Sequence, residues 1–213
     1  MSLYISMKTI SQNLKKSYRT YILEAAASGI YVYLVYAAIA GEITIYIPML
    51  EAFGFGLLVY LLYTKTGAHI NPALTLGLWS TEKIDTVTAV LYVIAQTAGA
   101  AVAVMFAQIV FTNSVAIEVS NGSQVFIAET VGMTIFAFCM AAVLYKKLPE
   151  SITGLVAASG LFIGMTIAIL SGSDGILNPL VAAAIGSLNP LYFLSSLVGG
   201  VCGIWLYKLL CLD

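Results

Sequence analysis

Apolar residues follow one another in long runs along this chain. Six of these runs are long enough to cross a bilayer, because about 20 helical residues span a hydrocarbon core that is about 30 Å thick. They lie at 21–40, 44–63, 87–111, 126–145, 153–171 and 188–210. The pattern therefore predicts six transmembrane helices.

Two shorter apolar stretches, 71–79 and 178–187, each have the length of half a span, about 15 Å as helix. Each starts with an Asn-Pro pair, in Asn71-Pro72-Ala73 and in Asn178-Pro179-Leu180. Asn is a preferred N-cap and Pro is favoured at the first helical position. We therefore expect two half-helices that begin inside the membrane and meet end to end.

The two Asn-Pro pairs belong to a repeat of the whole chain. Asn71 and Asn178 are 107 residues apart (178 minus 71), and Glu24 and Glu129 precede them by 47 and 49 residues. Three full spans in each half are an odd number, so the second half enters the membrane from the opposite side. The predicted fold is an all-α membrane protein with six transmembrane helices and two re-entrant half-helices in an inverted repeat.

This repeat divides the chain into four segments. An N-terminal segment, 1–20, precedes the first repeat, 21–111, and a connecting loop, 112–125, leads to the second repeat, 126–210.

The composition supports a membrane location. The chain is 61% hydrophobic and 9% charged, with a mean hydropathy of +0.98, whereas about 25% of the residues are charged in a soluble domain. Such a surface belongs in lipid. The net charge of −1 argues against a nucleic acid as partner.

The basic residues predict the orientation of the chain. If each half-helix enters and leaves on one side, all nine fall on the same side as the N-terminus: Lys8, Lys15, Lys16, Arg19, Lys65, Lys83, Lys146, Lys147 and Lys208. Cytoplasmic loops are enriched in Lys and Arg. We therefore expect a multi-pass protein with both termini in the cytoplasm, in the plasma membrane or an internal membrane, and without a cleaved leader.

Several motifs together resemble the aquaporin (major intrinsic protein) family over nearly the whole chain. The segment 67–75, Gly-Ala-His-Ile-Asn-Pro-Ala-Leu-Thr, is close to the first signature of that family, and Glu24 and Glu129 match its paired glutamates. Segment 92–100, which contains Gln96, looks like its third-span signature. Gly199, Gly200 and Tyr207 look like its sixth span.

The resemblance implies one pore in each subunit of a homotetramer, and it implies roles for several residues. Glu24 and Glu129 would hold the carbonyl groups of the two loops through hydrogen bonds, and His69 and Gln96 would also be structural. Two alternatives remain open from the residues themselves, a proton relay through the carboxyl groups and a pH gate at His69.

The outer filter is where the chain departs from the family pattern. Water channels of the family combine an aromatic residue, a histidine, a small residue and an arginine there. The corresponding positions carry Phe53 (with Phe55 as an alternative), Thr166, Gly175 and Val181. Phe53 is placed by allowing for a loop before Asn71 that is about two residues shorter than in the family pattern. Replacing the histidine and the arginine predicts a wider, less polar and uncharged constriction. Glu51 and Asp174 come close to the same mouth in the sequence, as outer-loop charges or as parts of the mouth.

The predicted function is a passive channel for water and for small neutral solutes such as glycerol, urea, ammonia or hydrogen peroxide. We expect no enzymatic activity, no cofactor and no metal. Two alternatives stay open: a non-conducting structural member of the same family, which fits the changes at Leu180 and Val181, and a secondary transporter, since transporters also use inverted repeats with broken helices.

Overall fold

The computed structural model describes residues 2–42, 47–111, 115, 122–187 and 189–212, and the side chains from residue 18 onward. All regular elements in these ranges are helices. Six helices are long and apolar enough to cross a membrane, as predicted from the apolar runs, with spans at Tyr18–Ala40, Ile47–Thr66, Thr86–Val110, Ser123–Leu144, Glu150–Leu170 and Pro190–Cys211.

The spans belong to helices α1 (Ser2–Ala40), α2 (Ile47–Thr66), α4 (Thr86–Val110), α5 (Ser123–Leu144), α6 (Thr153–Leu170) and α8 (Pro190–Cys211). A 3-10 turn, η2 (Glu150–Ile152), precedes α6. Because α1 already begins at Ser2, segment 1–20 is largely continuous with the first span rather than a separate element. Most of the predicted loop 112–125 lies outside the described residues.

The two short helices are α3 (Pro72–Ser80) and α7 (Pro179–Ala184). The predicted range 178–187 is too long for the second one. Its helix ends at Ala184 because Gly186 takes a φ of +75°, and the Ser187 N–H then bonds back to the Ala182 carbonyl at 3.0 Å. Glycine reaches this left-handed conformation without a steric penalty, which makes it a frequent helix terminator.

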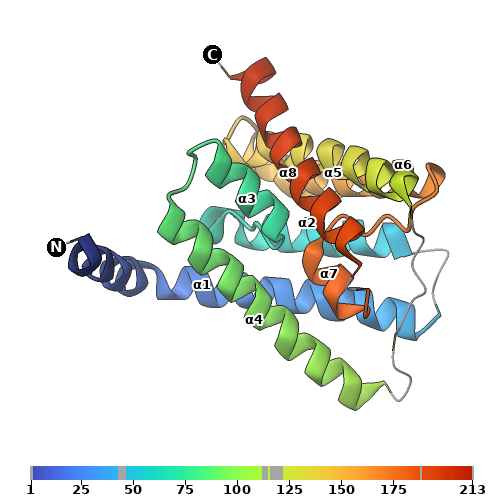
Figure 1. Cartoon of the computed structure of the whole chain (residues 1–213), viewed down its shortest axis with the longest axis horizontal. Helices are drawn as coiled ribbons and strands as arrows, with labels where there is room; N and C mark the ends of the chain where they lie inside the picture. The colour runs from blue at the N-terminus through green and yellow to red at the C-terminus, as the bar shows by residue number, and fades with distance from the viewer. Residues whose placement is uncertain (1, 43–46, 112–114, 116–121, 188, 213) are drawn as a thin grey trace.

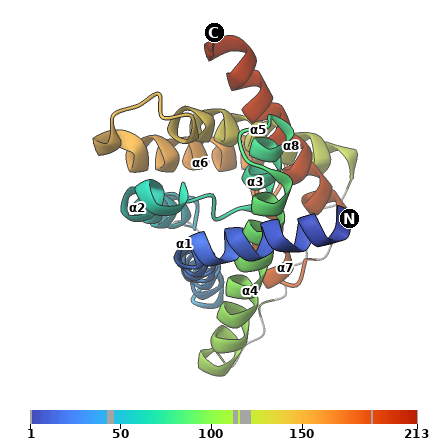
Figure 2. The ribbon, with the colours of Figure 1, turned by 90° about the vertical axis from the view of Figure 1, so that its left-hand side faces the viewer.

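Each short helix packs against the last span of the other half of the chain. Helix α3 packs on α8 and helix α7 packs on α4, while α2 and α6 pack on each other across the repeat. Figures 1 and 2 show α3 and α7 between the long helices. Each short helix also packs on the last span of its own half, and α3 and α7 contact each other directly.

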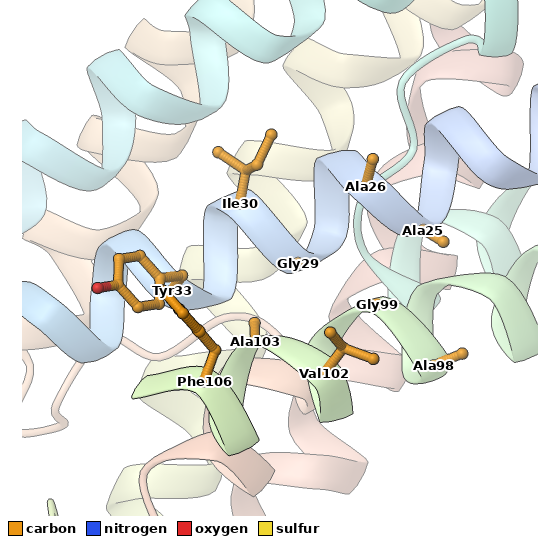
Figure 3. Close-up of a pocket in the computed structure, with 10 residues that line it drawn as sticks. All are labelled: Ala25, Ala26, Gly29, Ile30, Tyr33, Ala98, Gly99, Val102, Ala103 and Phe106. Carbon is orange, nitrogen blue, oxygen red and sulfur yellow. The ribbon is translucent and has the colours of Figure 1, made fainter. Parts of the chain in front are cut away.

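Glycines allow the long helices to cross closely. Gly29 of α1 faces Gly99 of α4, where a Cβ atom on Gly99 would lie only 1.9 Å from the Ala25 carbonyl oxygen (Figure 3). The outer side of this crossing is an apolar groove of about 540 Å³ that ends at the contact between Tyr33 and Phe106, with ring centroids 5.6 Å apart. A similar close crossing at glycines occurs between α2 and α6, where Gly56 faces Gly154.

The carboxyl-terminal ends of α3, α5 and α8 meet at one end of the bundle. Lys208 donates to the Thr81 carbonyl at 3.0 Å, and Lys83 lies over the Tyr145 ring at 4.9 Å. In the adjoining loop, Asp85 caps α4 and accepts hydrogen bonds from the hydroxyl and the backbone N–H of Thr88. These bonds favour the ionised carboxylate and lower the pKa of Asp85.

Candidate functional site

Asn71 and Asn178 start the two short helices in the same way. Each has an extended backbone, with φ of −140° and −145°, and each side-chain oxygen accepts a hydrogen bond from the N–H two residues later, at 2.9 Å. Pro72 and Pro179 follow at the first helical position. Both asparagines are buried. The cap therefore fixes each carboxamide and leaves its NH₂ group to point away from the helix.

The two asparagines are not equivalent beyond their caps. The Asn71 amide nitrogen donates to the Leu177 carbonyl at 3.0 Å, so the two half-chains are hydrogen bonded to each other at this junction. The Asn178 amide nitrogen is fully buried and has no acceptor among the described residues. Buried donors are nearly always paired. An unpaired one is therefore exceptional, and this one lies at the meeting point of the two helix starts.

The residues just before the two asparagines share an unusual conformation. Ile70 and Leu177 have φ of +58° and +48°, in the left-handed region. This region costs non-glycine residues about 1–3 kcal/mol and is found at functional sites. The same strain at both loop ends is a property of the repeat that the sequence did not reveal.

Glu24 and Glu129 hold these two strained residues. Glu24 accepts from the Ile70 N–H, and Glu129 accepts from the N–H groups of Ile176 and Leu177 at 2.9 and 2.8 Å. The predicted structural role of the carboxyl groups agrees with these contacts. The prediction that they bind loop carbonyls is wrong, because a carboxylate accepts hydrogen bonds and the backbone presents N–H donors here.

His69 and Gln96 complete the first loop. Gln96 donates to Glu24 at 2.9 Å and to the Thr75 hydroxyl at 3.1 Å, and the His69 ring nitrogen Nδ1 lies 3.1 Å from the same hydroxyl. The imidazole also packs on the Tyr92 ring at 4.5 Å. His69 is buried, so these contacts fit the structural role that the resemblance implies rather than a gate that moves.

The third residues of the two motifs pack differently. Ala73 is fully buried against Gly200 of α8, where the backbones come very close. Leu180 instead packs with Val32, Ala100 and Ala103 in a cluster between α1 and α4. The larger side chain is accommodated because α4 presents alanines to it. The difference between the motifs is therefore a difference in helix packing.

A third Asn-Pro pair, Asn189-Pro190, starts α8 with the same cap hydrogen bond, since its side chain accepts from the Leu191 N–H at 3.0 Å, although its φ is −67°. Asn189 is only partly buried. The Asn-Pro sequence by itself therefore indicates a helix start. Burial and opposition to the other motif distinguish Asn71 and Asn178.

Three of the four predicted filter residues lie in the second half of the chain. Val181 is 2% exposed on α7, and Gly175 is buried against Met165 and Ile169 of α6. Thr166 belongs to the same turn of α6, and its hydroxyl donates to the Phe162 carbonyl of its own helix at 2.7 Å. The Thr166 hydroxyl thus already donates its hydrogen within α6 and can only accept from another group.

Phe53, the fourth predicted filter residue, must be corrected. Its side chain is 63% exposed in a shallow groove between α2 and α6, beside Ala158 and Phe162. Successive helical residues are about 100° apart, so residues 51 and 55 share one face of α2 and residue 53 lies on the opposite side. The inward face therefore carries Glu51 and the alternative aromatic residue, Phe55.

Glu51 is a buried residue rather than an outer-loop charge. It is 3% exposed in α2, and its Oε2 accepts a hydrogen bond from the Tyr31 hydroxyl at 2.8 Å. The Tyr31 ring then packs edge to face on Phe55, and Phe55 on Phe136, with centroids 5.4 and 5.1 Å apart. A carboxyl group inside an apolar run was the signal in the sequence, because an intramembrane carboxyl group needs a partner.

Comparisons with known proteins agree with this architecture. The chain is 31% identical over 177 residues to aquaporin AqpM of Methanothermobacter thermautotrophicus and 30% identical over 164 residues to aquaporin NIP1-1 of Arabidopsis thaliana. These matches cover 73% and 67% of the chain. They span 65% and 54% of the lengths of the two relatives.

The fold also matches a solved structure, the aquaglyceroporin from Plasmodium falciparum. The TM-score is 0.64 at 22% sequence identity, over 90% of this chain and 93% of that one. Independently, a model of the Major intrinsic protein family matches residues 11–170. With the paired half-helices and their buried asparagines, this match shows that the chain belongs to the major intrinsic protein family, a family of membrane channels.

Proposed function

We propose that this chain is a passive transmembrane channel for water that also admits small neutral solutes such as glycerol, urea, ammonia or hydrogen peroxide. The pathway passes the junction of α3 and α7. The observation that carries the proposal is the buried amide NH₂ of Asn178, which has no acceptor among the described residues. A permeating molecule with an oxygen or nitrogen lone pair satisfies this donor as it passes.

The charge at the junction disfavours cations. The N-terminus of α3 points at it and carries about half a positive charge, and the Asn178 amide adds the positive end of its dipole. Half-helix dipoles exclude cations and protons in pores of this kind. Helix α7 has only six residues and adds less. Neutral molecules are therefore the expected cargo.

The outer half supports the admission of solutes other than water. Val181 stands at the filter position where an arginine is expected and Gly175 where a small residue is expected, and neither offers a hydrogen-bonding side chain. The loss of the arginine removes a bulky, fixed donor from the mouth. We therefore propose a filter that is wider and less polar than that of a strict water channel.

One observation favours a non-conducting structural member of the family instead. Tyr31, Phe55 and Phe136 stack in the interior, each at most 1% exposed. Tyr31 follows Glu24 by seven residues, and Phe136 follows Glu129 by seven, so both rings lie on the helix faces that hold the two loops. Apolar constrictions close pores by dewetting. Only flux measurements separate this alternative from an open channel.

The test is stopped-flow light scattering on proteoliposomes that contain the purified chain. Under an osmotic gradient we expect them to shrink faster than protein-free vesicles, and in glycerol or urea gradients to re-swell faster. Water and solute fluxes equal to those of protein-free vesicles, with monodisperse protein, would establish the structural alternative.

Two further properties belong to the proposal. The described basic side chains Lys83 and Lys208 lie at the end of the bundle where α3 and α8 finish, so we assign this end and both termini to the cytoplasm. The family resemblance also implies a homotetramer with one pathway in each subunit.

A further inference from the structure

We propose that Glu51, anchored by Tyr31, is the specificity-determining polar residue in the outer half of the pathway, and that it favours solutes that donate several N–H hydrogen bonds, with urea as the representative. This inference rests on the proposed channel function. It concerns a residue that neither the Asn-Pro pair nor the filter positions include.

The position of Glu51 follows from the helices around it. Glu51 lies in the second turn of α2, and Glu129 lies in the second turn of α5, at the ends where both helices begin. The two helices are in contact there, because the ring of Phe55, four residues after Glu51, packs on the ring of Phe136, seven residues after Glu129. Since Glu129 holds Ile176 and Leu177, Glu51 lies at the level of the second loop, beyond the asparagines.

The anchoring of Glu51 leaves one oxygen available. Tyr31 is 1% exposed, and its hydroxyl donates to Oε2 of Glu51. The other carboxyl oxygen, Oε1, receives no hydrogen bond from any residue that the structure describes, and no Lys or Arg there pairs with the group. A buried carboxyl group without a basic partner is costly in a membrane protein. A permeating molecule that donates to Oε1 reduces this cost.

The two polar groups that bound the outer half of the proposed pathway, at Asn178 and Glu51, then define a class of solutes. Asn178 offers a donor at the junction, and Glu51 offers an acceptor oxygen farther out. Urea has one carbonyl acceptor and four N–H donors, so it satisfies both groups with different atoms. Glycerol and water have hydroxyl groups that both donate and accept, so they adapt to either polarity. Urea therefore depends more strongly than glycerol on an acceptor at residue 51.

Glu51→Gln tests this dependence with almost no change of shape. The glutamine oxygen still accepts from Tyr31, and its NH₂ group replaces the free acceptor with a donor. We expect the ratio of urea to glycerol permeability in proteoliposomes to fall about fivefold, the effect of one hydrogen bond. Water permeability should stay within about twofold of the wild-type value, because water adapts to a donor.

Two further variants complete the experiment. Tyr31→Phe leaves the carboxyl group in place without its anchor, so the ratio of urea to glycerol permeability should fall by a smaller factor. If Glu51→Gln does not fold, this variant tests the role of Glu51 instead. Glu42→Gln changes an exposed carboxyl group at the same end of the bundle and should leave the ratio unchanged.

An unchanged urea-to-glycerol ratio in a folded, water-conducting Glu51→Gln protein overturns the role of Glu51 and leaves the channel intact. A wild-type protein that conducts water but neither urea nor glycerol also overturns it. If folded wild-type protein conducts nothing, the proposed channel function itself fails. The water permeability of the wild type separates these outcomes.

Discussion

Glu129→Ala should abolish flux and leave little folded protein. Glu129 accepts hydrogen bonds from the Ser173 hydroxyl and from the backbone N–H groups of Ile176 and Leu177, all buried. Each buried donor that loses its acceptor costs about 1–3 kcal/mol. The three donors together cost about 3–9 kcal/mol, which approaches the whole stability of a typical protein, about 5–15 kcal/mol. The measurement is the yield of monodisperse protein in detergent, followed by stopped-flow water flux.

The consequence for function follows from the strain at Leu177. Without Glu129 nothing described holds its N–H in the left-handed conformation, and its carbonyl no longer meets the Asn71 amide. Glu129→Gln keeps one acceptor oxygen and should retain part of the yield. Glu150→Ala, at an exposed carboxyl group, should behave as wild type. Normal water flux in Glu129→Ala would show that the loop does not depend on this residue.

Gly99→Ala should separate α1 from α4, although alanine has the higher helix propensity. A Cβ atom on Gly99 would lie 1.9 Å from the Ala25 carbonyl oxygen and 2.6 Å from its carbonyl carbon. Backbone atoms cannot rotate away, so one helix must move. Overpacking costs about 1–3 kcal/mol when side chains yield, and a backbone clash should exceed this range. Leu180 packs at the same interface, so the second motif is disturbed too.

Gly54→Ala is the matched control for this substitution. It also adds a methyl group to a transmembrane helix, but its nearest neighbour is the end of the Leu34 side chain, at 2.2 Å, which can change rotamer. We expect a melting temperature in detergent close to the wild-type value for Gly54→Ala and a clear decrease for Gly99→Ala. Equal melting temperatures would mean that the α1–α4 crossing does not limit stability.

The spans and the half-helices could be predicted because their signals are local. Twenty consecutive apolar residues indicate a membrane helix wherever they occur, and Asn71-Pro72 and Asn178-Pro179 combine two cap preferences in adjacent residues. The paired glutamates were found through the repeat, which compares one half of the chain with the other. None of these inferences needed the length of a loop.

The prediction of the filter residue on α2 depended on the length of the loop before Asn71, and this prediction was wrong. The loop between α2 and Asn71 is compact because Gly67, Ala68 and Ile70 take left-handed backbone conformations, with φ of +83°, +51° and +58°. A sequence does not reveal positive φ at alanine and isoleucine, which rarely adopt it. A shift of two residues along a helix turns the side chain by about 200°, so Phe53 lies opposite the face that carries the alternative residue, Phe55.

The remaining differences between the sequence-based predictions and the structure arise from the packing of helices against one another. Helix α7 stops at Ala184 because Gly186 closes it, although the apolar run continues in the sequence. The role of Leu180 depends on which residues α4 presents to it, and a repeat within one chain says nothing about that partner. Likewise, Asn189-Pro190 has the same local signal as the two central motifs, and only its tertiary environment, its partial burial and the lack of an opposing motif, distinguishes it from them.

The central claim is that the pathway runs past the free amide donor of Asn178, and Asn178→Asp tests it most directly. Aspartate keeps the oxygen that caps Leu180 and replaces the NH₂ group with a second oxygen. Asn189→Asp makes the same exchange at a cap outside the junction. The measurement is the osmotic water permeability of proteoliposomes, with folding checked by melting temperature.

We predict that folded Asn178→Asp protein loses about fivefold or more of its water permeability, as expected when one hydrogen bond to the permeating molecule is lost, while Asn189→Asp retains the wild-type value. Equal permeabilities for wild type and both variants would contradict a pathway at this junction.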